Sequence, residues 1–335
     1  MTIAEIESAC DASIPLEFSR HALEVPELSH REMFFPLGFP TVLSTNSPEI
    51  LSQARNLWPI LEKRFDTEPI RVDVHVLESD SKECPPAPVF RFMYPLSISV
   101  ANTNNYKIGH LDRNLTQITI TRATERHKSY LGYFFLGFAP HDHIESRYTA
   151  PVHAGCVVRN GRGVLLCGDS GAGKSSLSFA CARAGWTYVS DDASDLLIEG
   201  KDRLVIGNCE QVRFRPSAVD LFPELEGLEI TPRAVGKPSI ELPTGPIPGM
   251  ICAPSAEVDY VVFLNRRVSG PPELVPYRTD VARYFMRQVL FGPAEILAAQ
   301  YAALERLLTA QVFELRYSDL DWAVHRLETL VREGY

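Results

Sequence analysis

The stretch HAGCVVRNGRGVLLCGDSGAGKSSLSFACARAGWTYVSDD, residues 153–192, decides the fold of this 335-residue chain. It begins with two apolar runs joined at Asn160-Gly161, a dipeptide that strongly predicts a tight β-hairpin. A glycine-rich segment and a helical pattern follow, and Gly185 is placed to cap the helix C-terminus. The short apolar run 187–190 predicts a strand. Because the strand before the glycines is the second arm of a hairpin, we expect a mixed rather than an all-parallel sheet.

The glycine-rich loop, residues 168–175, matches the pattern G-x-x-x-x-G-K-[ST] in full. Glycines let the backbone bend around a phosphate and aim N–H groups at it, and the following helix N-terminus adds positive partial charge. Lys174 would place a cation on the β- and γ-phosphates, and the Ser175 hydroxyl suits Mg²⁺. A chance glycine-rich turn is the alternative, but motif and context together favour a nucleotide site with ATP and Mg²⁺ as cofactors. The residues expected to bind the nucleotide are Gly168, Asp169, Ser170, Gly171, Ala172, Gly173, Lys174, Ser175 and Ser176.

Two adjacent acids, Asp191 and Asp192, follow the next predicted strand. Strand ends on this side of an α/β sheet are where a carboxylate can meet the γ-phosphate and its metal. One carboxylate could hold Mg²⁺ directly or through water, and the other could accept a proton from an attacking hydroxyl. Taken alone, VSDDASD also fits a solvated turn, but beside the glycine-rich loop the catalytic interpretation is favoured.

Residues 153–198 resemble the catalytic core of the HPr kinase/phosphorylase family and its wider relatives, which include HPr-kinase-like enzymes that phosphorylate a serine on precursor peptides. The resemblance implies an α/β P-loop kinase core on a mixed sheet, of the HPr kinase/phosphoenolpyruvate carboxykinase type. It implies that Asp191 is the general base and that Asp192 assists through the metal or a hydrogen bond, with His153 near this pair. Ser175 and Asp192 are then the expected metal ligands.

The chain also departs from that family. Ser176 stands where HPr kinases carry an acid, and their glycine-rich signature is not recognisable in EQVRFRPSAVDLFPEL, residues 210–225. We therefore expect a divergent relative without phosphorylase activity. Arg213 and Arg215 alternate in this stretch and would share one face of a strand, where a guanidinium could stabilise phosphoryl charge. The family uses an arginine in its C-terminal part, which makes Arg266 the expected catalytic arginine.

The first 150 residues carry no motif that we can assign. A helix is expected from Pro48 to about Leu61, and IRVDVHVL, residues 70–77, alternates like a half-buried strand. VFRFMYPLSISV and TQITIT are further strand candidates. We predict an N-terminal α+β domain, residues 1–150, for acceptor recognition or assembly, and a catalytic domain, residues 151–335.

The second domain carries further patterns. We expect a hairpin turning at Gly200, a buried strand at DYVVFLN, a strand at VFELRY and a last helix with Ser318 as its N-cap. Lys237 lies in a predicted proline-rich loop that could close over a substrate.

One polar cluster could be mistaken for a metal site. His141, Asp142, His143 and Glu145 would suit Zn²⁺ or Fe²⁺, but adjacent residues rarely all point at one ion. We expect a polar loop there instead, after an apolar helix. The aromatic residues within 130–138 are expected in the core.

Composition narrows the function classes. The net charge of −9 argues against a general hold on nucleic acid or anionic membrane, and no apolar run reaches the length of a spanning helix. Seven scattered cysteines without a C-x-x-C pair fit reduced thiols in a cytoplasmic protein, and the first residues lack a signal-peptide pattern.

The leading prediction is an ATP/Mg²⁺-dependent kinase acting on a hydroxyl acceptor, which is a serine on a peptide or protein. Its alternatives are a kinase for a free hydroxy amino acid or another small molecule, and a nucleotide-binding regulatory or assembly module without phosphotransfer. A carboxykinase-like enzyme would need a transition-metal site that the sequence does not show. A homo-oligomer stays open.

Overall fold

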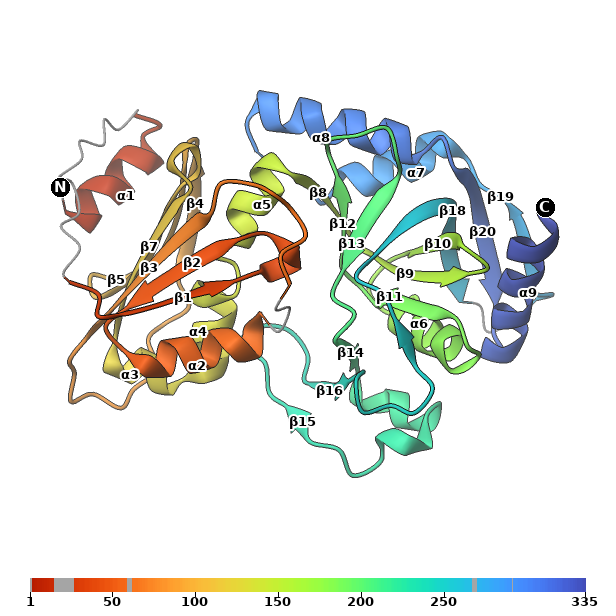
Figure 1. Ribbon diagram of the computed structural model, residues 1–335, viewed down its shortest axis with the longest axis horizontal. Helices are drawn as coiled ribbons and strands as arrows, with labels where there is room; N and C mark the ends of the chain where they lie inside the picture. The colour runs from red at the N-terminus through yellow and green to blue at the C-terminus, as the bar shows by residue number, and fades with distance from the viewer. Residues whose placement is uncertain (1, 15–26, 59–61, 267–269, 291) are drawn as a thin grey trace. The chain divides into compact units, whose positions relative to one another are not determined.

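The computed structural model describes residues 2–14, 27–58, 62–266, 270–290 and 292–335. The chain forms two compact units, shown in Figure 1. Unit 1 comprises Met1–Ser146 with Arg233–Gly236, and unit 2 comprises Arg147–Pro232 with Lys237–Tyr335. In the described part of the chain, no helix is long and apolar enough to cross a membrane.

Unit 1 is built on a mixed sheet with the strand order β1-β2-β3-β7-β6-β5-β4. β2, β3 and β7 run parallel, and the other neighbours are antiparallel. The strands are β1 (His30–Phe34), β2 (Thr41–Thr45), β3 (Ile70–Leu77), β4 (Val89–Met93), β5 (Leu96–Asn102), β6 (Asn105–His110) and β7 (Leu115–Thr121). The helical segments are α1 (Ile3–Asp11), η1 (Pro36–Gly38), α2 (Pro48–Leu57), η2 (Leu111–Arg113), α3 (Arg122–Arg126), α4 (Lys128–Leu131), η3 (Gly132–Leu136) and α5 (His141–Arg147).

The sequence expectations for unit 1 are met in part. Ile70, Val72, Val74 and Val76 of β3 are all buried, as their alternation predicts. α2 begins at Pro48, but it ends at Leu57 rather than near residue 61, which lies outside the described residues. The polar loop predicted at residues 141–145 is wrong, because these residues form α5.

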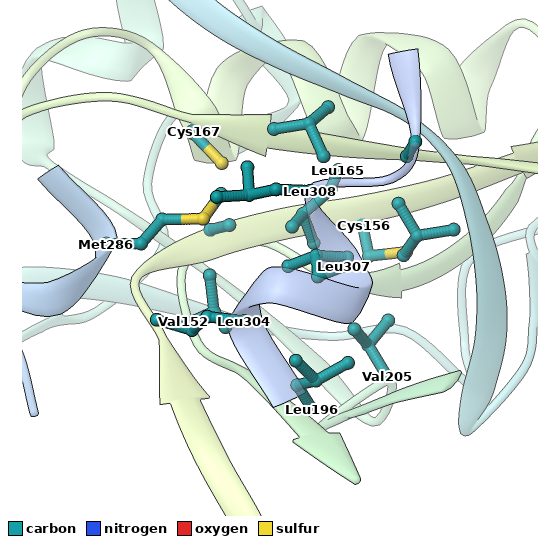
Figure 2. Packing of buried hydrophobic residues seen from close by; sticks show 14 of the residues in the cluster. Val152, Cys156, Leu165, Cys167, Leu196, Val205, Met286, Leu304, Leu307 and Leu308 are labelled. Carbon is teal, nitrogen blue, oxygen red and sulfur yellow. The ribbon is translucent and has the colours of Figure 1, made fainter. Parts of the chain in front are cut away.

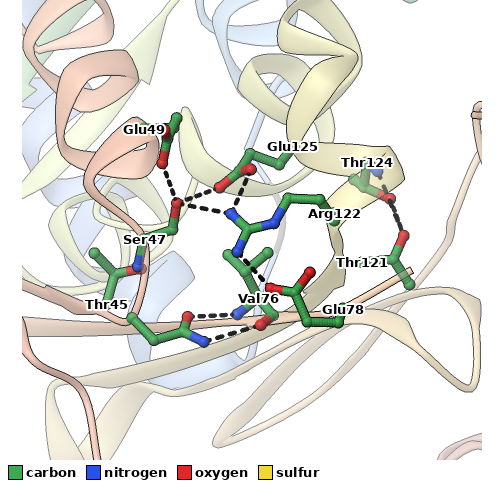
Figure 3. A network of polar contacts seen from close by, with 10 residues as sticks. Thr45, Ser47, Glu49, Val76, Glu78, Thr121, Arg122, Thr124 and Glu125 are labelled. Carbon is green, nitrogen blue, oxygen red and sulfur yellow. Dashed lines mark hydrogen bonds and ion pairs between the residues drawn. The ribbon is translucent and has the colours of Figure 1, made fainter. Parts of the chain in front are cut away.

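A polar network ties the start of α2 to β3 and α3, as Figure 3 shows. The Ser47 hydroxyl contacts Glu49 at 2.7 Å and also bonds Glu125. Arg122 donates to Glu125 at 2.8 Å and to Glu78 at 2.6 Å. The Ser47 side chain therefore bonds carboxylates and does not cap the backbone of α2. The network connects α2, α3 and the end of β3.

Unit 2 is built on a larger mixed sheet with the order β17-β11-β9-β10-β18-β13-β12-β8. In addition, β20 pairs with β18, and β19 pairs with β20. The pairs β10/β18, β18/β20 and β11/β17 are parallel. The strands are β8 (Thr149–Val152), β9 (Ala154–Arg159), β10 (Arg162–Cys167), β11 (Thr187–Ser190), β12 (Ser194–Leu197), β13 (Leu204–Gly207), β17 (Ile251–Cys252), β18 (Ser255–Arg266), β19 (Glu273–Pro276) and β20 (Gln311–Tyr317). The helices are α6 (Lys174–Arg183), α7 (Thr279–Arg287), α8 (Ala294–Leu307) and α9 (Leu320–Glu333).

The predicted mixed sheet is confirmed by the β9/β10 hairpin. The two strands pair antiparallel, and Asn160 (φ 51°) and Gly161 (φ 75°) turn between them. Two successive positive φ angles are what a tight turn of this hand requires. β10 also pairs in parallel with β18, so the strand that feeds the glycine-rich loop has one antiparallel and one parallel neighbour. The hairpin of β12 and β13 is present as well.

Helices cover both faces of the unit 2 sheet (Figure 1). On one face, α6 and α9 bury Leu177 and Leu327 against the strands. On the other face, Met286 of α7 and Leu304 of α8 belong to one buried cluster with Leu165 of β10, and Figure 2 shows Leu304 beside Val152. Residues 164–167 of β10 are buried on both faces, which fits their uninterrupted apolar sequence VLLC.

A small sheet, ordered β14-β16-β15, lies in the segment between β13 and β17. Its elements are β14 (Gln211–Phe214), η4 (Pro216–Asp220), η5 (Pro223–Leu225), β15 (Ile230–Thr231) and β16 (Ser239–Pro243). The loop predicted around Lys237 is therefore partly wrong, because β16 begins two residues later. The predicted N-cap Ser318 is also wrong by one residue: the Asp319 side chain accepts from the Trp322 backbone N–H at 2.7 Å.

Candidate active site

The glycine-rich loop connects β10 to α6, as its motif predicts. Gly171 (φ 94°) and Gly173 (φ 101°) adopt left-handed backbone conformations that a side chain would strain. A Cβ on Gly173 would also lie 2.6 Å from the Tyr317 hydroxyl oxygen. The loop can take this path only because both positions are glycine.

Tyr317, at the end of β20, contacts the loop through its hydroxyl group. It is buried, and its hydroxyl donates to the Ala172 carbonyl at 3.2 Å. Burial raises the pKa of Tyr317 to about 12, so the phenol stays a donor at neutral pH. Sequence reasoning missed this residue, because 145 positions separate it from Ala172 and nothing in VFELRY marks the contact.

Lys174 begins α6 and is almost fully buried. Its ammonium donates to the carbonyls of Gly168 at 2.7 Å and Asp169 at 3.3 Å. It also lies 3.1 Å from Asp192 Oδ1. Asp192 thus neutralises the Lys174 ammonium, the charge that the motif predicts to contact phosphate. The Asp192 side chain is half exposed.

His153 lies between β8 and β9, with Nε2 3.5 Å from Asp192 Oδ1. Burial lowers its pKa below the usual 6.5, an effect that Asp192 partly offsets and Lys174 strengthens. The imidazole is therefore neutral at pH 7. The structure brings His153, Asp192 and Lys174 together in one cluster.

Asp191 follows β11 directly. The backbone N–H of Arg213, on β14, donates to its Oδ2 at 3.0 Å. Burial raises the pKa of Asp191; the Arg213 hydrogen bond and the Ser175 hydroxyl lower it, and the Asp192 charge raises it further. β9 approaches closely here because residue 155 is a glycine, whose Cβ would lie 2.8 Å from the Asp191 carbonyl oxygen.

The two arginines of VRFRP take different partners. Arg215 donates from Nη2 to the Ser170 hydroxyl of the loop at 2.8 Å, and a Cβ on Gly171 would lie 3.4 Å from its Nη1. The Arg213 side chain lies 3.5 Å from Glu241 on β16 instead. The expectation that both side chains share one face of a strand is therefore not met: β14 ends at Phe214, Arg215 lies just beyond it, and the two side chains take different partners.

Arg266 ends β18, opposite Tyr317 in the register with β20. β9 and β10 lie between its strand and β11, which leads to Asp191. The structure thus places Arg266 on the other side of the loop strand from the paired acids. Its neighbour Arg267 lies outside the described residues.

The donor set fits Mg²⁺. Ser175 and Asp192 offer a hydroxyl and a carboxylate oxygen beside Lys174 and Asp191. No group of three or more His, Cys, Asp or Glu residues able to hold a metal occurs within the described residues. A Mg²⁺ ion that keeps waters and phosphate oxygens needs only one or two protein ligands, so a denser cluster is not required.

The polar cluster on α5 is dispersed among separate partners. His141 Nδ1 faces the Gly137 carbonyl at 2.9 Å, and His143 Nε2 lies 2.8 Å from the Thr116 hydroxyl. Asp142 pairs with the buried Lys107 at 2.8 Å. These side chains serve the packing of unit 1.

The geometry defines an α/β core with a lysine-bearing glycine loop and a paired acid at the carboxyl ends of its strands. No protein-family model matches the chain, and no curated protein does. Among solved structures, the chain is weakly similar to the HPr(Ser) kinase/phosphatase from Coxiella burnetii. That similarity has a TM-score of 0.30 and 18% identity, and it covers 54% of this chain and 93% of that chain.

Proposed function

We propose that this protein is an ATP- and Mg²⁺-dependent kinase that transfers the γ-phosphate to a hydroxyl, namely a serine on a peptide or protein. The observation that carries the proposal is the meeting of two groups with complementary tasks. Lys174 of the glycine-rich loop lies 3.1 Å from Asp192, and the half-buried Asp191 precedes Asp192 in the chain. This arrangement supports phosphate binding and proton acceptance at one site.

The loop residues 168–176 would bind the nucleotide. Their backbone N–H groups and the α6 N-terminus favour phosphate, and the Lys174 ammonium would exchange the Asp192 carboxylate for phosphate oxygens. Ser175 and Asp192 would hold Mg²⁺, which when bound supplies charge neutralisation at the phosphate oxygens. His153 would help to position Asp192, from which it lies 3.5 Å away.

Asp191 would act as the general base. The Arg213 N–H donates to Oδ2, and this bond would orient the carboxylate toward the acceptor hydroxyl. In the transfer, the acceptor oxygen forms a bond to the γ-phosphorus as the bond to the β,γ-bridging oxygen breaks, and ADP leaves. The hydroxyl proton passes to Asp191, and its raised pKa makes the carboxylate a better base than an exposed one.

Unit 1 is proposed to recognise the acceptor or to support assembly, and the protein is proposed to act in the cytoplasm. Reduced cysteines fit that compartment: of the described cysteines, none is disulfide-bonded, and Cys156, Cys167, Cys181 and Cys209 are buried thiols.

The test follows the γ-phosphate of labelled ATP with Mg²⁺. Wild type, Lys174→Ala and Asp191→Asn are incubated with a serine-containing peptide library, with free serine and with cell extract. Asp202→Asn, the same chemical change at an exposed loop position, is the control. We expect label on peptide or protein with wild type and with the control only.

Two other outcomes would redirect the proposal. Label on free serine alone would make the protein a small-molecule kinase. Label that stays on ATP or reaches only water, equally for wild type and Asp191→Asn, would overturn the kinase proposal in favour of a nucleotide-binding module.

A further inference from the structure

We propose that Arg215 is the catalytic arginine of this chain, supplied in cis to the phosphoryl group in transfer. The inference rests on the proposed function and adds a residue to it. It also replaces Arg266 in the role of charge stabiliser.

Arg215 contacts the glycine-rich loop directly. Its Nη2 donates to the Ser170 hydroxyl at 2.8 Å, and its Nη1 lies beside Gly171. These two residues form the turn of the loop that precedes Lys174. A side chain on Gly171 would crowd the guanidinium, so the loop sequence leaves room for it.

Two hydrogen bonds hold the backbone before Arg215, one to β11 and one to Asp191. The Tyr188 hydroxyl of β11 donates to the Gln211 carbonyl at 2.9 Å, and the Arg213 N–H donates to Asp191 at 3.0 Å. Arg215 therefore approaches the loop from the side of the general base. That is the side on which the γ-phosphate must lie if Asp191 is to reach the acceptor hydroxyl.

Packing fixes the position of Arg215 further. Phe214 is buried, with its ring 5.2 Å from that of Phe179 on α6. On the other side of Arg215, Pro216 begins η4, and the Arg215 carbonyl accepts from the Ala218 N–H at 2.9 Å. The base of the side chain is thus anchored to the helix that begins at Lys174, while its tip is exposed.

The chemistry of a guanidinium fits this position. It carries five N–H donors, and the bond to Ser170 uses one. In phosphoryl transfer, charge spreads over three equatorial oxygens, and an arginine beside them stabilises the transition state more than the bound nucleotide. Lys174 would contact these oxygens from inside the loop, and Arg215 would contact them from outside it.

The other candidate arginines are placed less well. The Arg213 side chain is directed to Glu241. Arg266 stands at the end of β18, beyond β10 as seen from Asp191. Arg266 lies opposite Tyr317 in the β18/β20 register and so reaches the loop from the side away from the paired acids.

The experiment compares Arg215→Ala, Arg215→Lys and Arg266→Ala with wild type in the labelled-ATP assay. Arg183→Ala is the matched control, because Arg183 is an exposed arginine of the same region that pairs with Glu224 and lies over Phe222. Turnover and nucleotide affinity are measured separately, and melting temperature reports folding.

We expect Arg215→Ala to lower kcat by about 10²-fold or more, with the Kd for ATP changed by less than about fivefold. Arg215→Lys should recover little of this, and added guanidinium ion should partly restore Arg215→Ala. Arg183→Ala should keep wild-type turnover. Such a split between kcat and Kd is not produced by a purely structural role.

The inference is overturned if wild type transfers phosphate and Arg215→Ala retains turnover within about threefold, or if Arg266→Ala shows the large loss of kcat instead. A wild type that transfers no phosphate to any acceptor defeats the proposed function. The two failures are therefore distinguishable.

Discussion

Each unit of this molecule contains a polar cluster in which a cation contacts carboxylates and other oxygen atoms, but the two clusters differ in how accessible those partners are. In unit 1, the guanidinium of Arg122 is enclosed by Glu78, Glu125 and the Ser47 hydroxyl. In unit 2, the ammonium of Lys174 contacts two loop carbonyls and the half-exposed Asp192. The first cluster binds three elements of the fold to one another.

The two clusters differ in whether the carboxylate partner of the cation can be replaced by another anion. The main partner of Arg122, Glu125, is buried and cannot leave without exposing an unpaired charge. The partner of Lys174 is half open to solvent, so an incoming anion can take its place at small cost. A closed network stabilises a fold, whereas a buried cation with an accessible counter-ion is the arrangement that the proposed phosphate site needs.

The largest expected effect tests the second half of this comparison. Lys174→Ala should reduce phosphate transfer by at least about 10²-fold and weaken ATP binding, because the phosphates lose their buried cation. Its melting temperature should change by no more than about 4 °C. Calorimetric titration with ATP and a thermal scan give both values. Unfolding of unit 2 in this variant would instead assign Lys174 a structural task.

Arg122→Ala should show the opposite pattern. Removal of the guanidinium leaves the buried Glu125 unpaired, which should destabilise unit 1 by about 2–4 kcal/mol. Denaturant unfolding monitors this loss, and transfer per folded molecule should persist. Arg122→Lys keeps the charge but loses the forked geometry, so an intermediate stability is expected. A stability equal to wild type for Arg122→Ala would break the comparison.

Tyr317→Phe sharpens the comparison at the loop itself. The change removes only the hydroxyl that donates to Ala172. We expect the Kd for ATP to rise about three- to tenfold, the equivalent of roughly 1 kcal/mol for one hydrogen bond. The kcat at saturating ATP should stay near that of wild type. A loss confined to kcat would show that the hydroxyl acts in the transition state instead.

The smallest effect concerns Asp73 of β3, a carboxylate outside both clusters. Burial raises its pKa, while Ser44 and nearby arginines lower it. Because the folded pKa lies above the unfolded one, the charged form disfavours folding at pH 7, and this cost vanishes once pH falls below the unfolded pKa. Asp73→Asn should therefore stabilise unit 1 by less than about 1 kcal/mol at pH 7 and not at pH 3. Paired thermal scans at the two pH values decide this, and a gain that persists at pH 3 would contradict it.

Local sequence signals predicted much of unit 2. Asn160-Gly161, the loop glycines and Gly185 specify backbone conformations within a few residues, so the hairpin, the loop and α6 lie where the pattern indicated. The boundary errors have local causes too. Asp319 replaced Ser318 as the N-cap, since both neighbours can accept a backbone hydrogen bond there.

The strands of unit 1 were harder to predict from the sequence, because their positions depend on pairing with strands far along the chain. β3 was evident from its alternation, but β1 and β2 carry no comparable signal. Their place in the sheet follows from pairing with residues far along the chain, such as Leu43 opposite Val72. Pairing of this kind depends on the packed core and not on local propensity.

By itself, the sequence determined the glycine-rich loop, its strand and helix, and the paired acids, because each depends on residues close together in the chain. Only the tertiary structure decided which distant groups meet them. Tyr317 reaches Ala172, Arg213 holds Asp191, and Arg215 rather than Arg266 touches the loop at Ser170. Strand order sets these contacts, and strand order arises from the burial of whole faces of the sheet, which no short stretch of sequence encodes.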